Sequence, residues 1–286
     1  MLKIGVITDE ISQDIRDVIK LMKKYGLKAV ELRSIWDRQI FELDDEEINS
    51  LKQIFKRESV KVCAIASPVF KSHIDNKEEY DKHIKIFQRC IELSDVFETN
   101  IIRAFTFWRS DVKPSIDEIC KLYLPIVEVA EKNKKYIAVE NEPSVNLTNA
   151  ALVKELIEKI DSEYVKALWD PANDIFEPYN EVPYPDGYGI IKDYIVHMHL
   201  KDAKKIDNEV KSVTFGEGDV DWKGQLRRLI QDGYDGYISL ETHYRKRPLS
   251  EDLLNKPSGN TFSMGGYEAS DECLYNLNKT LNEIGG

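Results

Sequence analysis

The chain has 286 residues, of which 42% are hydrophobic and 32% are charged, a length and composition that suit a single α/β barrel domain. It contains no apolar run near the roughly 18 residues of a membrane span, so we expect no membrane partner. Acidic residues outnumber Lys and Arg by 51 to 40, and the net charge of −11 repels polyanions, which argues against nucleic acid as a partner.

The N-terminal segment and the cysteines predict the cellular compartment. Residues 1–8 lack the charged, apolar and cleavage regions of a signal peptide and instead predict a first strand. The cysteines are scattered without a CxxC pair, so they predict neither a disulfide framework nor a thiolate zinc site. We therefore expect a cytoplasmic protein with reduced, mostly buried thiols at Cys63, Cys90, Cys120 and Cys273.

Strand and helix signals alternate through the first half of the chain. A first helix is expected to begin near Ser12 and to end at Gly26, because glycine readily adopts the left-handed conformation that ends helices. Asp44 to Glu47 and Ser115 to Glu118 have the spacing of capping boxes and predict the starts of two further helices. Apolar spacing predicts another helix around residues 80–91. The short apolar runs that predict strands are residues 1–8, 29–32, 60–66 and 101–107.

The second half continues the alternation. Pro178, Pro183 and Pro185 weaken the sixth repeat, since they predict a loop and leave room only for a short helix before Ile195. An open, doubly wound nucleotide-binding sheet would also alternate, but it would have a glycine-rich turn after the first strand, and residues 8–12 contain no glycine. The pattern therefore predicts a single-domain (β/α)8 TIM barrel over residues 1–286. Its remaining strands are predicted at 136–140, 165–170, 195–199 and 237–241, with helices near 149–160, 222–231 and 267–284.

Each of the last four predicted strands ends in a potential metal ligand. These residues are Glu140, Asp170, His199 and Glu241, and they are separated by 30, 29 and 42 residues. A (β/α)8 barrel of roughly 250 residues uses about 31 residues for each strand and its helix, so the first two gaps match one repeat. Because all parallel strands of a barrel direct their C-terminal ends to one face, we expect the four side chains to converge into a site.

Five segments around these positions carry a family resemblance. They are Val139-Glu-Asn-Glu142, Trp169-Asp-Pro-Ala-Asn173, His197-Met-His-Leu-Lys-Asp202, Phe215-Gly-Glu-Gly-Asp-Val-Asp-Trp222 and Ser239-Leu-Glu-Thr-His243. In this order they resemble the sugar isomerase and epimerase superfamily with the xylose-isomerase-like barrel, which also includes inosose dehydratases and endonuclease IV. The resemblance implies that Glu140, Asp170, His199 and Glu241 bind the metal. In the epimerase branch it further implies that Glu140 and Glu241 are the two acid/base carboxylates.

The implied chemistry explains the residue types. Removing a proton next to a sugar carbonyl forms an enediolate, which a divalent ion stabilises as Lewis acid and template. Three carboxylates and one imidazole form an oxygen-rich donor set, which suits Mn²⁺, Mg²⁺ or Co²⁺ better than a structural zinc site. We favour one Mn²⁺ ion and keep Zn²⁺ as an alternative.

Six further residues are candidates for contacting the substrate. Lys201 either reaches a substrate hydroxyl or phosphate or forms a surface ion pair with Asp202. His197 lies two residues before His199 and therefore faces the same side of the strand. It either contacts the substrate or is packed or hydrogen-bonded beside the metal ligands. Gly216 to Gly218 lacks the Lys and Ser/Thr of a phosphate loop and predicts a turn before a helix capped by Asp221. The candidates are Phe70, Trp108, Glu142, Asn173, His197 and Lys201.

Two departures from the family pattern leave the substrate open. Free-ketose 3-epimerases have His where this chain has Asn173, and Arg where it has Lys205. We expect a divalent-metal-dependent isomerase or epimerase of a small sugar, sugar phosphate or polyol derivative, as a monomer or homo-oligomer. One alternative is an inosose-dehydratase-like lyase that uses the same metal site. The others are an endonuclease-IV-like phosphodiesterase, which the five histidines and acidic balance disfavour, and a non-catalytic metal-binding barrel.

Overall fold

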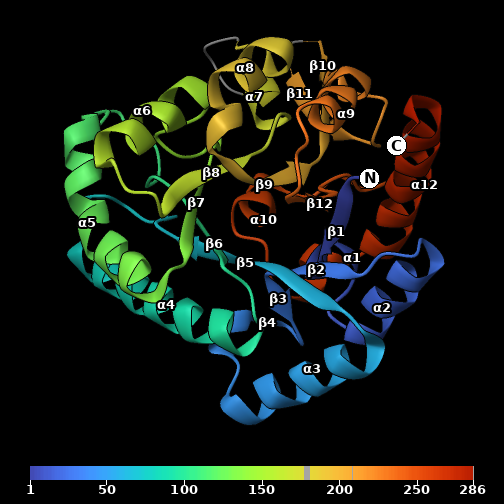
Figure 1. The fold of residues 1–286 in the computed structure, drawn as a ribbon, viewed down its shortest axis with the longest axis horizontal. Helices are drawn as coiled ribbons and strands as arrows, with labels where there is room; N and C mark the ends of the chain where they lie inside the picture. The colour runs from blue at the N-terminus through green and yellow to red at the C-terminus, as the bar shows by residue number, and fades with distance from the viewer. Residues whose placement is uncertain (177–180, 208, 286) are drawn as a thin grey trace. The chain divides into compact units, whose positions relative to one another are not determined.

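A computed structural model describes residues 1–176, 181–207 and 209–285 (Figure 1). Its parallel strands form a closed barrel with helices between successive strands, which confirms the predicted (β/α)8 fold. The barrel strands in spatial order are β1 (Lys3–Ile7), β12 (Tyr237–Leu240), β9 (Ile195–Leu200), β8 (Val165–Trp169), β7 (Tyr136–Glu140), β6 (Ile101–Ala104), β5 (Lys61–Val69) and β2 (Ala29–Leu32).

The chain divides into two compact units, each described by itself below. The first unit combines residues 1–63 with the chain from residue 199 onward, and the second comprises residues 64–198. Strand β5 begins in the first unit and continues in the second, while β9 runs from the second unit into the first.

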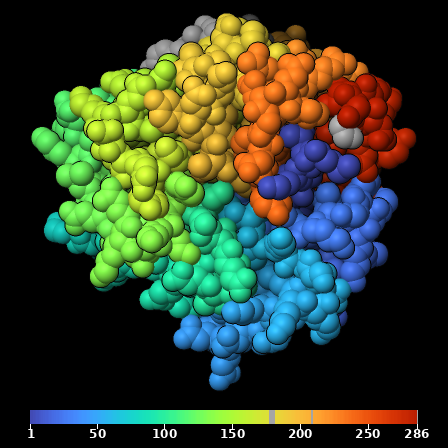
Figure 2. Space-filling model, in the orientation of Figure 1, coloured from blue at the N-terminus to red at the C-terminus, as the bar shows by residue number. Residues whose placement is uncertain are grey.

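In the first unit, β1 pairs in parallel with both β2 and β12. The long C-terminal helix α12 packs against α1, α2 and α9, and the space-filling view shows its red atoms beside the blue atoms of the α2 region (Figures 1 and 2). The other elements are α1 (Thr8–Ile11), α2 (Ile15–Lys24), β3 (Ser34–Ile35), β4 (Arg38–Gln39), η1 (Ile40–Glu42), α3 (Asp45–Glu58), β10 (Asp202–Ile206), β11 (Glu209–Val213), α9 (Trp222–Gln231), α10 (Glu251–Asn255), α11 (Gly259–Ser263) and α12 (Gly266–Ile284).

In the second unit, β5, β6, β7, β8 and β9 pair in parallel in chain order. Glu140, the last residue of β7, lies opposite Leu168 of β8, so Asp170 follows two residues later at the same edge. Helices α4, α5 and α6 pack side by side (Figure 1). The helical elements are α4 (Lys77–Val96), α5 (Ile116–Asn133), α6 (Ala150–Ile160), α7 (Asn173–Phe176), η2 (Pro183–Gly187), α8 (Tyr188–Ile191) and η3 (Lys192–Tyr194).

Several local predictions are confirmed. Asp44 with Glu47, and Ser115 with Glu118, form capping boxes at the starts of α3 and α5. Gly26 has a φ of +68° directly after α2, and the helix before Ile195 is short, although Pro178 lies outside the described residues. The predicted burial of most cysteines is confirmed for Cys63, Cys90 and Cys273, while Cys120 is partly exposed.

Other local predictions are wrong in detail. The first long helix begins at Ile15 with Asp14 as its cap rather than near Ser12, because the short helix α1 occupies the residues after β1. Strand β6 ends at Ala104 instead of residue 107, and the predicted last residue, Phe107, adopts a left-handed φ of +63° that is not compatible with a strand. An antiparallel hairpin of β10 and β11 follows β9, and the sequence did not predict it. No helix among the described residues is long and apolar enough to cross a membrane.

Candidate functional site

In the first unit, charged and polar side chains gather at the C-terminal ends of the barrel strands. Arg33, just after β2, is 2% exposed and donates from all three guanidinium nitrogens to carboxylates. Its Nε lies 2.9 Å from Asp9 Oδ1, its Nη2 lies 2.7 Å from Glu10 Oε1, and its Nη1 lies 2.8 Å from Glu241 Oε1. Burial alone would lower the pKa of Arg33, but the three carboxylates together raise it. The guanidinium therefore stays charged and fixes the ends of three strands relative to one another within this unit.

Glu241 directly follows β12, and its backbone N–H donates to Leu200 O at 3.0 Å, at the end of β9. Its Oε2 accepts a hydrogen bond from Lys201 Nζ at 3.0 Å and lies 3.4 Å from His199 Nδ1. Burial raises the pKa of this carboxyl, yet Lys201, His243 and His199 outweigh burial and hold it well below its usual range. Glu241 is therefore an ionised carboxylate in a buried setting.

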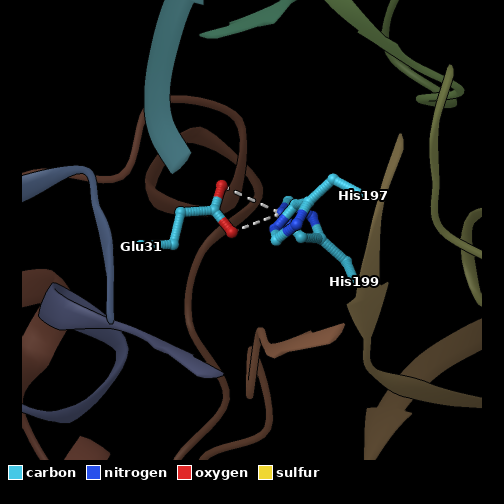
Figure 3. Close-up of side chains that lie close together, drawn as sticks. All are labelled: Glu31, His197 and His199. Carbon is cyan, nitrogen blue, oxygen red and sulfur yellow. Dashed lines mark hydrogen bonds and ion pairs between the residues drawn. The ribbon is translucent and has the colours of Figure 1, made fainter. Parts of the chain in front are cut away.

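His199 lies between two carboxylates of the first unit. Its Nε2 is 3.2 Å from each carboxylate oxygen of Glu31, and Figure 3 shows this carboxylate facing the imidazole. Both side chains are fully buried. A carboxylate behind a histidine fixes its ring orientation and tautomer, an arrangement typical of histidines that bind metals.

Glu10, Glu241 and His243 form a further group whose potential ligand atoms lie within 4.8 Å of one another, with Glu10 and Glu241 buried and His243 partly exposed. Burial raises the pKa of Glu10, but His243, Arg33 and Arg245 lower it to about 2. Burial also lowers the pKa of His243 to about 4. Because the two guanidinium groups already bind Glu10, this group is better described as an ion-pair cluster that supports Glu241 than as a separate cation site.

The predicted surface ion pair of Lys201 and Asp202 is wrong. Lys201 is buried on Glu241, whereas Asp202 accepts backbone hydrogen bonds from Ala203, Gly216 and Gly218. Burial raises the pKa of Asp202 to about 6. The Gly216 to Gly218 turn is confirmed, and a Cβ at residue 218 would collide with the Asp202 carboxylate, which explains the glycine there. Asp221 caps α9 as predicted.

In the second unit, Glu140 and Asp170 end two paired strands. A carboxylate oxygen of each lies within 4.8 Å of the other, and both residues are buried. Arg103 Nη1 donates to Glu140 Oε2 at 3.2 Å, and the same guanidinium donates to Ser67 O and Ala66 O at the end of β5. Arg103 thus offsets the negative charge of Glu140.

Asn141 and Asn173 hold the backbone around Asp170. The Asn141 side chain accepts from Asp170 N at 2.9 Å and donates to Asp170 O at 2.8 Å, so it fixes both backbone groups of that residue. Asn173 donates from Nδ2 to Asn141 O at 2.7 Å. The amide nitrogen of Asn173 is therefore used in positioning Asp170, while its role toward a substrate stays a prediction.

The other substrate candidates of the second unit occupy different surroundings. Phe70 is fully buried and stacks on Phe107 with ring centroids 4.7 Å apart. Trp108 is partly exposed, Glu142 is at the edge of burial, and His197 is fully buried in β9. Their contacts with a substrate stay predictions, and the positions of Trp108 and Glu142 suit such contacts best.

Sequence reasoning missed the partners of the predicted ligands. Glu31, Arg33, Glu10 and Arg103 are all buried and all lie at or just after the C-terminal ends of β1, β2 and β6. The available signal was a charged residue inside or directly after an apolar run, which indicates a buried, paired charge.

Comparisons with known proteins agree with this architecture. A curated relative, the uncharacterized protein MJ1311 of Methanocaldococcus jannaschii, is 30% identical over 156 residues, which are 52% of this chain and 51% of the relative. The chain therefore spans about half the length of the curated relative that it matches.

Solved structures share the fold at low identity. An L-ribulose 3-epimerase has a TM-score of 0.74 at 13% identity, over 99% of this chain and 96% of that chain. The IOLI protein with a binding zinc atom has a TM-score of 0.72 at 17% identity, over 99% and 98%. A family model described as xylose isomerase-like TIM barrel matches residues 19–259. The chain thus belongs to the xylose isomerase-like TIM barrel family.

Proposed function

We propose that this protein is a divalent-metal-dependent isomerase or epimerase of a small carbohydrate, built as a single barrel domain. One observation carries the proposal: each unit contributes a buried pair of potential metal ligands at barrel strand ends, Glu140 with Asp170 and His199 with Glu241. Barrel enzymes of this fold place their active sites at that end of the strands.

The donor chemistry fits one divalent ion bound by Glu140, Asp170, His199 and Glu241. Three carboxylates and one imidazole favour Mn²⁺, with Mg²⁺, Co²⁺ and Zn²⁺ as alternatives. Glu140 Oε2 accepts from Arg103, and Glu241 accepts from Arg33 at Oε1 and from Lys201 at Oε2, so these two carboxylates would share their charge between the protein's own cations and the bound ion. When bound, the ion supplies a Lewis acid and a template for the carbonyl and hydroxyl oxygens of the sugar.

The chain's own carboxylates then move the proton. We assign to Glu241, an ionised carboxylate, the removal of the proton from the carbon next to the carbonyl. Glu140 is the complementary group, which returns a proton to the opposite face in an epimerase. To Lys201, which donates to Glu241, we assign a hydrogen bond to the substrate oxygen on which negative charge develops.

Exchange of carbon-bound hydrogen in D₂O tests the proposal. The Mn²⁺-loaded protein is incubated with D-fructose, D-tagatose, D-psicose, D-sorbose and their phosphates, and NMR then detects deuterium beside the carbonyl. We expect deuterium in at least one sugar, and we expect a chelator and the Glu241→Gln substitution to abolish its incorporation. The exposed Glu46→Gln substitution, in the same unit, is the matched control and retains exchange.

Two outcomes would contradict this assignment. Interconversion of an epimer pair without solvent deuterium in either partner would rule out the two-carboxylate scheme. A product lighter than the substrate by the mass of water would identify a lyase that uses the same residues.

A further inference from the structure

In the second unit, two loops share an unusual backbone feature. Phe70 after β5 and Phe107 after β6 both adopt a left-handed φ of +63°. This conformation is unfavourable for a non-glycine residue, so such residues persist where the surrounding structure requires them. Phe70 is followed by Lys71 and Phe107 by Trp108. The ammonium group of Lys71 lies over the ring of Trp108.

Lys71 lies over two aromatic rings. Its Nζ is 4.5 Å from the centroid of Phe105 and 5.6 Å from that of Trp108. It also lies 3.4 Å from Glu142 Oε2, and the two side chains are only 9% and 12% exposed. Ser144 donates to the other Glu142 oxygen from both its backbone N–H, at 3.2 Å, and its hydroxyl, at 2.8 Å. The loop after β7 thus aims Glu142 Oε2 at Lys71.

Backbone hydrogen bonds fix these loops to one another. Phe107 N donates to Phe70 O at 2.8 Å, and Trp108 N donates to Ser72 O at 2.9 Å. Arg109 N donates to Ser144 O at 3.0 Å, which joins the loop after β6 to the loop after β7. The side chains of Lys71, Trp108 and Glu142 therefore occupy a preorganised arrangement, which lowers the entropy lost when a ligand binds.

A shared ring connects this arrangement to Glu140. The guanidinium of Arg103 lies 4.7 Å from the centroid of Phe105, the ring that also contacts Lys71, and it donates to Glu140. Glu140 and Glu142 lie two residues apart at the end of β7. Lys71 and Arg103 thus contact the same ring, and Glu142 follows Glu140 two residues later in the chain.

We infer that Lys71, Glu142 and Trp108 form a subsite that recognises neighbouring hydroxyls of an uncharged sugar or polyol. The inference rests on the proposed function and names its substrate class. A hydroxyl both donates and accepts hydrogen bonds, so it can accept from the Lys71 ammonium and donate to the Glu142 carboxylate. The partly exposed Trp108 offers an apolar face for the C–H groups of the sugar.

The charges of this subsite disfavour a phosphate group. Glu142 offsets the charge of Lys71, and Glu140 offsets that of Arg103. In these two contacts between described residues, each cation therefore has a carboxylate as its partner. A phosphate dianion next to Lys71 would also lie next to Glu142, and the repulsion would cancel the attraction. The subsite therefore selects the free sugar over its phosphate.

Ligand-observed NMR titration of the full-length, Mn²⁺-loaded protein tests the subsite. The probes are D-fructose, D-tagatose, D-psicose and D-sorbose, each paired with its phosphate at the terminal carbon. We expect at least one free ketose to bind more tightly than its phosphate. We expect Lys71→Met and Glu142→Gln each to weaken that binding about 10- to 100-fold, the effect of losing a hydrogen bond to a charged group. Methionine keeps the apolar stem of Lys71, so the loops retain their packing.

The matched control removes a lysine from an exposed pair of the same unit. Lys77→Met breaks the ion pair with Asp81 on α4, and we expect the affinity for the ketose to stay at the wild-type value. Thermal melting of each variant checks that the fold is intact. Tighter binding of the phosphate, wild-type affinity in both subsite variants, or no binding of any free ketose would overturn the inference.

The test separates the subsite from the proposed reaction. If the subsite variants lose binding but the wild-type protein exchanges no deuterium, the subsite stands and the reaction is wrong. If exchange proceeds with an unchanged KM in both subsite variants, the reaction stands and the subsite is wrong.

Discussion

The imidazole of His199 lies against the carboxylate of Glu31, with Nε2 3.2 Å from each carboxylate oxygen and Nδ1 3.4 Å from Glu241 Oε2. The imidazole thus places Nε2 toward Glu31 and Nδ1 toward Glu241. If Nδ1 gives its lone pair to a bound cation, Nε2 keeps the proton and donates it to the Glu31 carboxylate. Glu31 is therefore a positioning residue that prepares His199 to bind a cation.

Replacing Glu31 with glutamine is expected to weaken Mn²⁺ binding about 10- to 100-fold, because the histidine loses the charge that fixes its tautomer and raises its basicity. Isothermal titration calorimetry of the metal-free protein with MnCl₂ measures this change. Glu46→Gln, an exposed substitution on α3, is the control and should bind Mn²⁺ like the wild type. An unchanged dissociation constant in Glu31→Gln would show that Glu31 does not act on the metal ligand.

A crystal soaked in MnCl₂ should show one anomalous peak within about 2.0–2.4 Å of donor atoms from Glu140, Asp170, His199 and Glu241. These four side chains combine ligand chemistry with burial at strand ends, so they are expected to bind the ion together. A peak bound by Glu10 and His243 instead would require Arg33 and Arg245 to move away from Glu10. No peak near any of the four would contradict the proposed metal site.

Glu241→Gln should abolish turnover of the identified substrate while the circular dichroism spectrum stays that of a folded barrel. Arg33 and Lys201 both bind this carboxylate, so the neutral amide leaves two buried cations with less compensation. We therefore expect a lower melting temperature as well as the loss of activity. Near wild-type turnover in this variant would show that Glu241 is not the acid/base.

His83 on α4 should make stability depend on pH. Its Nδ1 accepts a hydrogen bond from Phe70 N at 2.9 Å, and burial lowers its pKa to about 4 from the ordinary 6.5. Between these values the unfolded chain binds a proton that the folded protein does not. The free energy of unfolding should therefore fall as the pH drops from 6.5 to 4, by at most about 3 kcal/mol from this residue.

Urea unfolding of wild type and His83→Gln at pH 7, 5.5 and 4.5 measures this contribution as the difference between the two proteins. Glutamine keeps an acceptor for Phe70 N but does not titrate, so the stability of the variant should depend less on pH. His73→Gln, at an exposed histidine that pairs with Glu79, is the control. Equal pH dependence in wild type and His83→Gln would contradict the prediction.

Local signals in the sequence were sufficient for most of the fold. The capping boxes at Asp44 and Ser115 depend on residues three positions apart, so the sequence alone places the starts of α3 and α5. Short apolar runs placed β2 and β7 to the residue. Local signals fail where the backbone leaves a regular conformation. Phe107 adopts a left-handed φ, which the conformational preference of phenylalanine does not predict.

The sequence by itself determined the alternation of strands and helices and the four strand-end residues with ligand chemistry, because both depend on short-range patterns. The tertiary structure alone decided which charges meet. Arg33 and Glu241 are 208 residues apart and yet hydrogen-bonded, and Lys71 meets Glu142 from a loop 71 residues away. Such partners follow from how strand ends are brought together in each unit, and in a buried setting the partner decides whether a charge is stabilised. No local pattern contains that information.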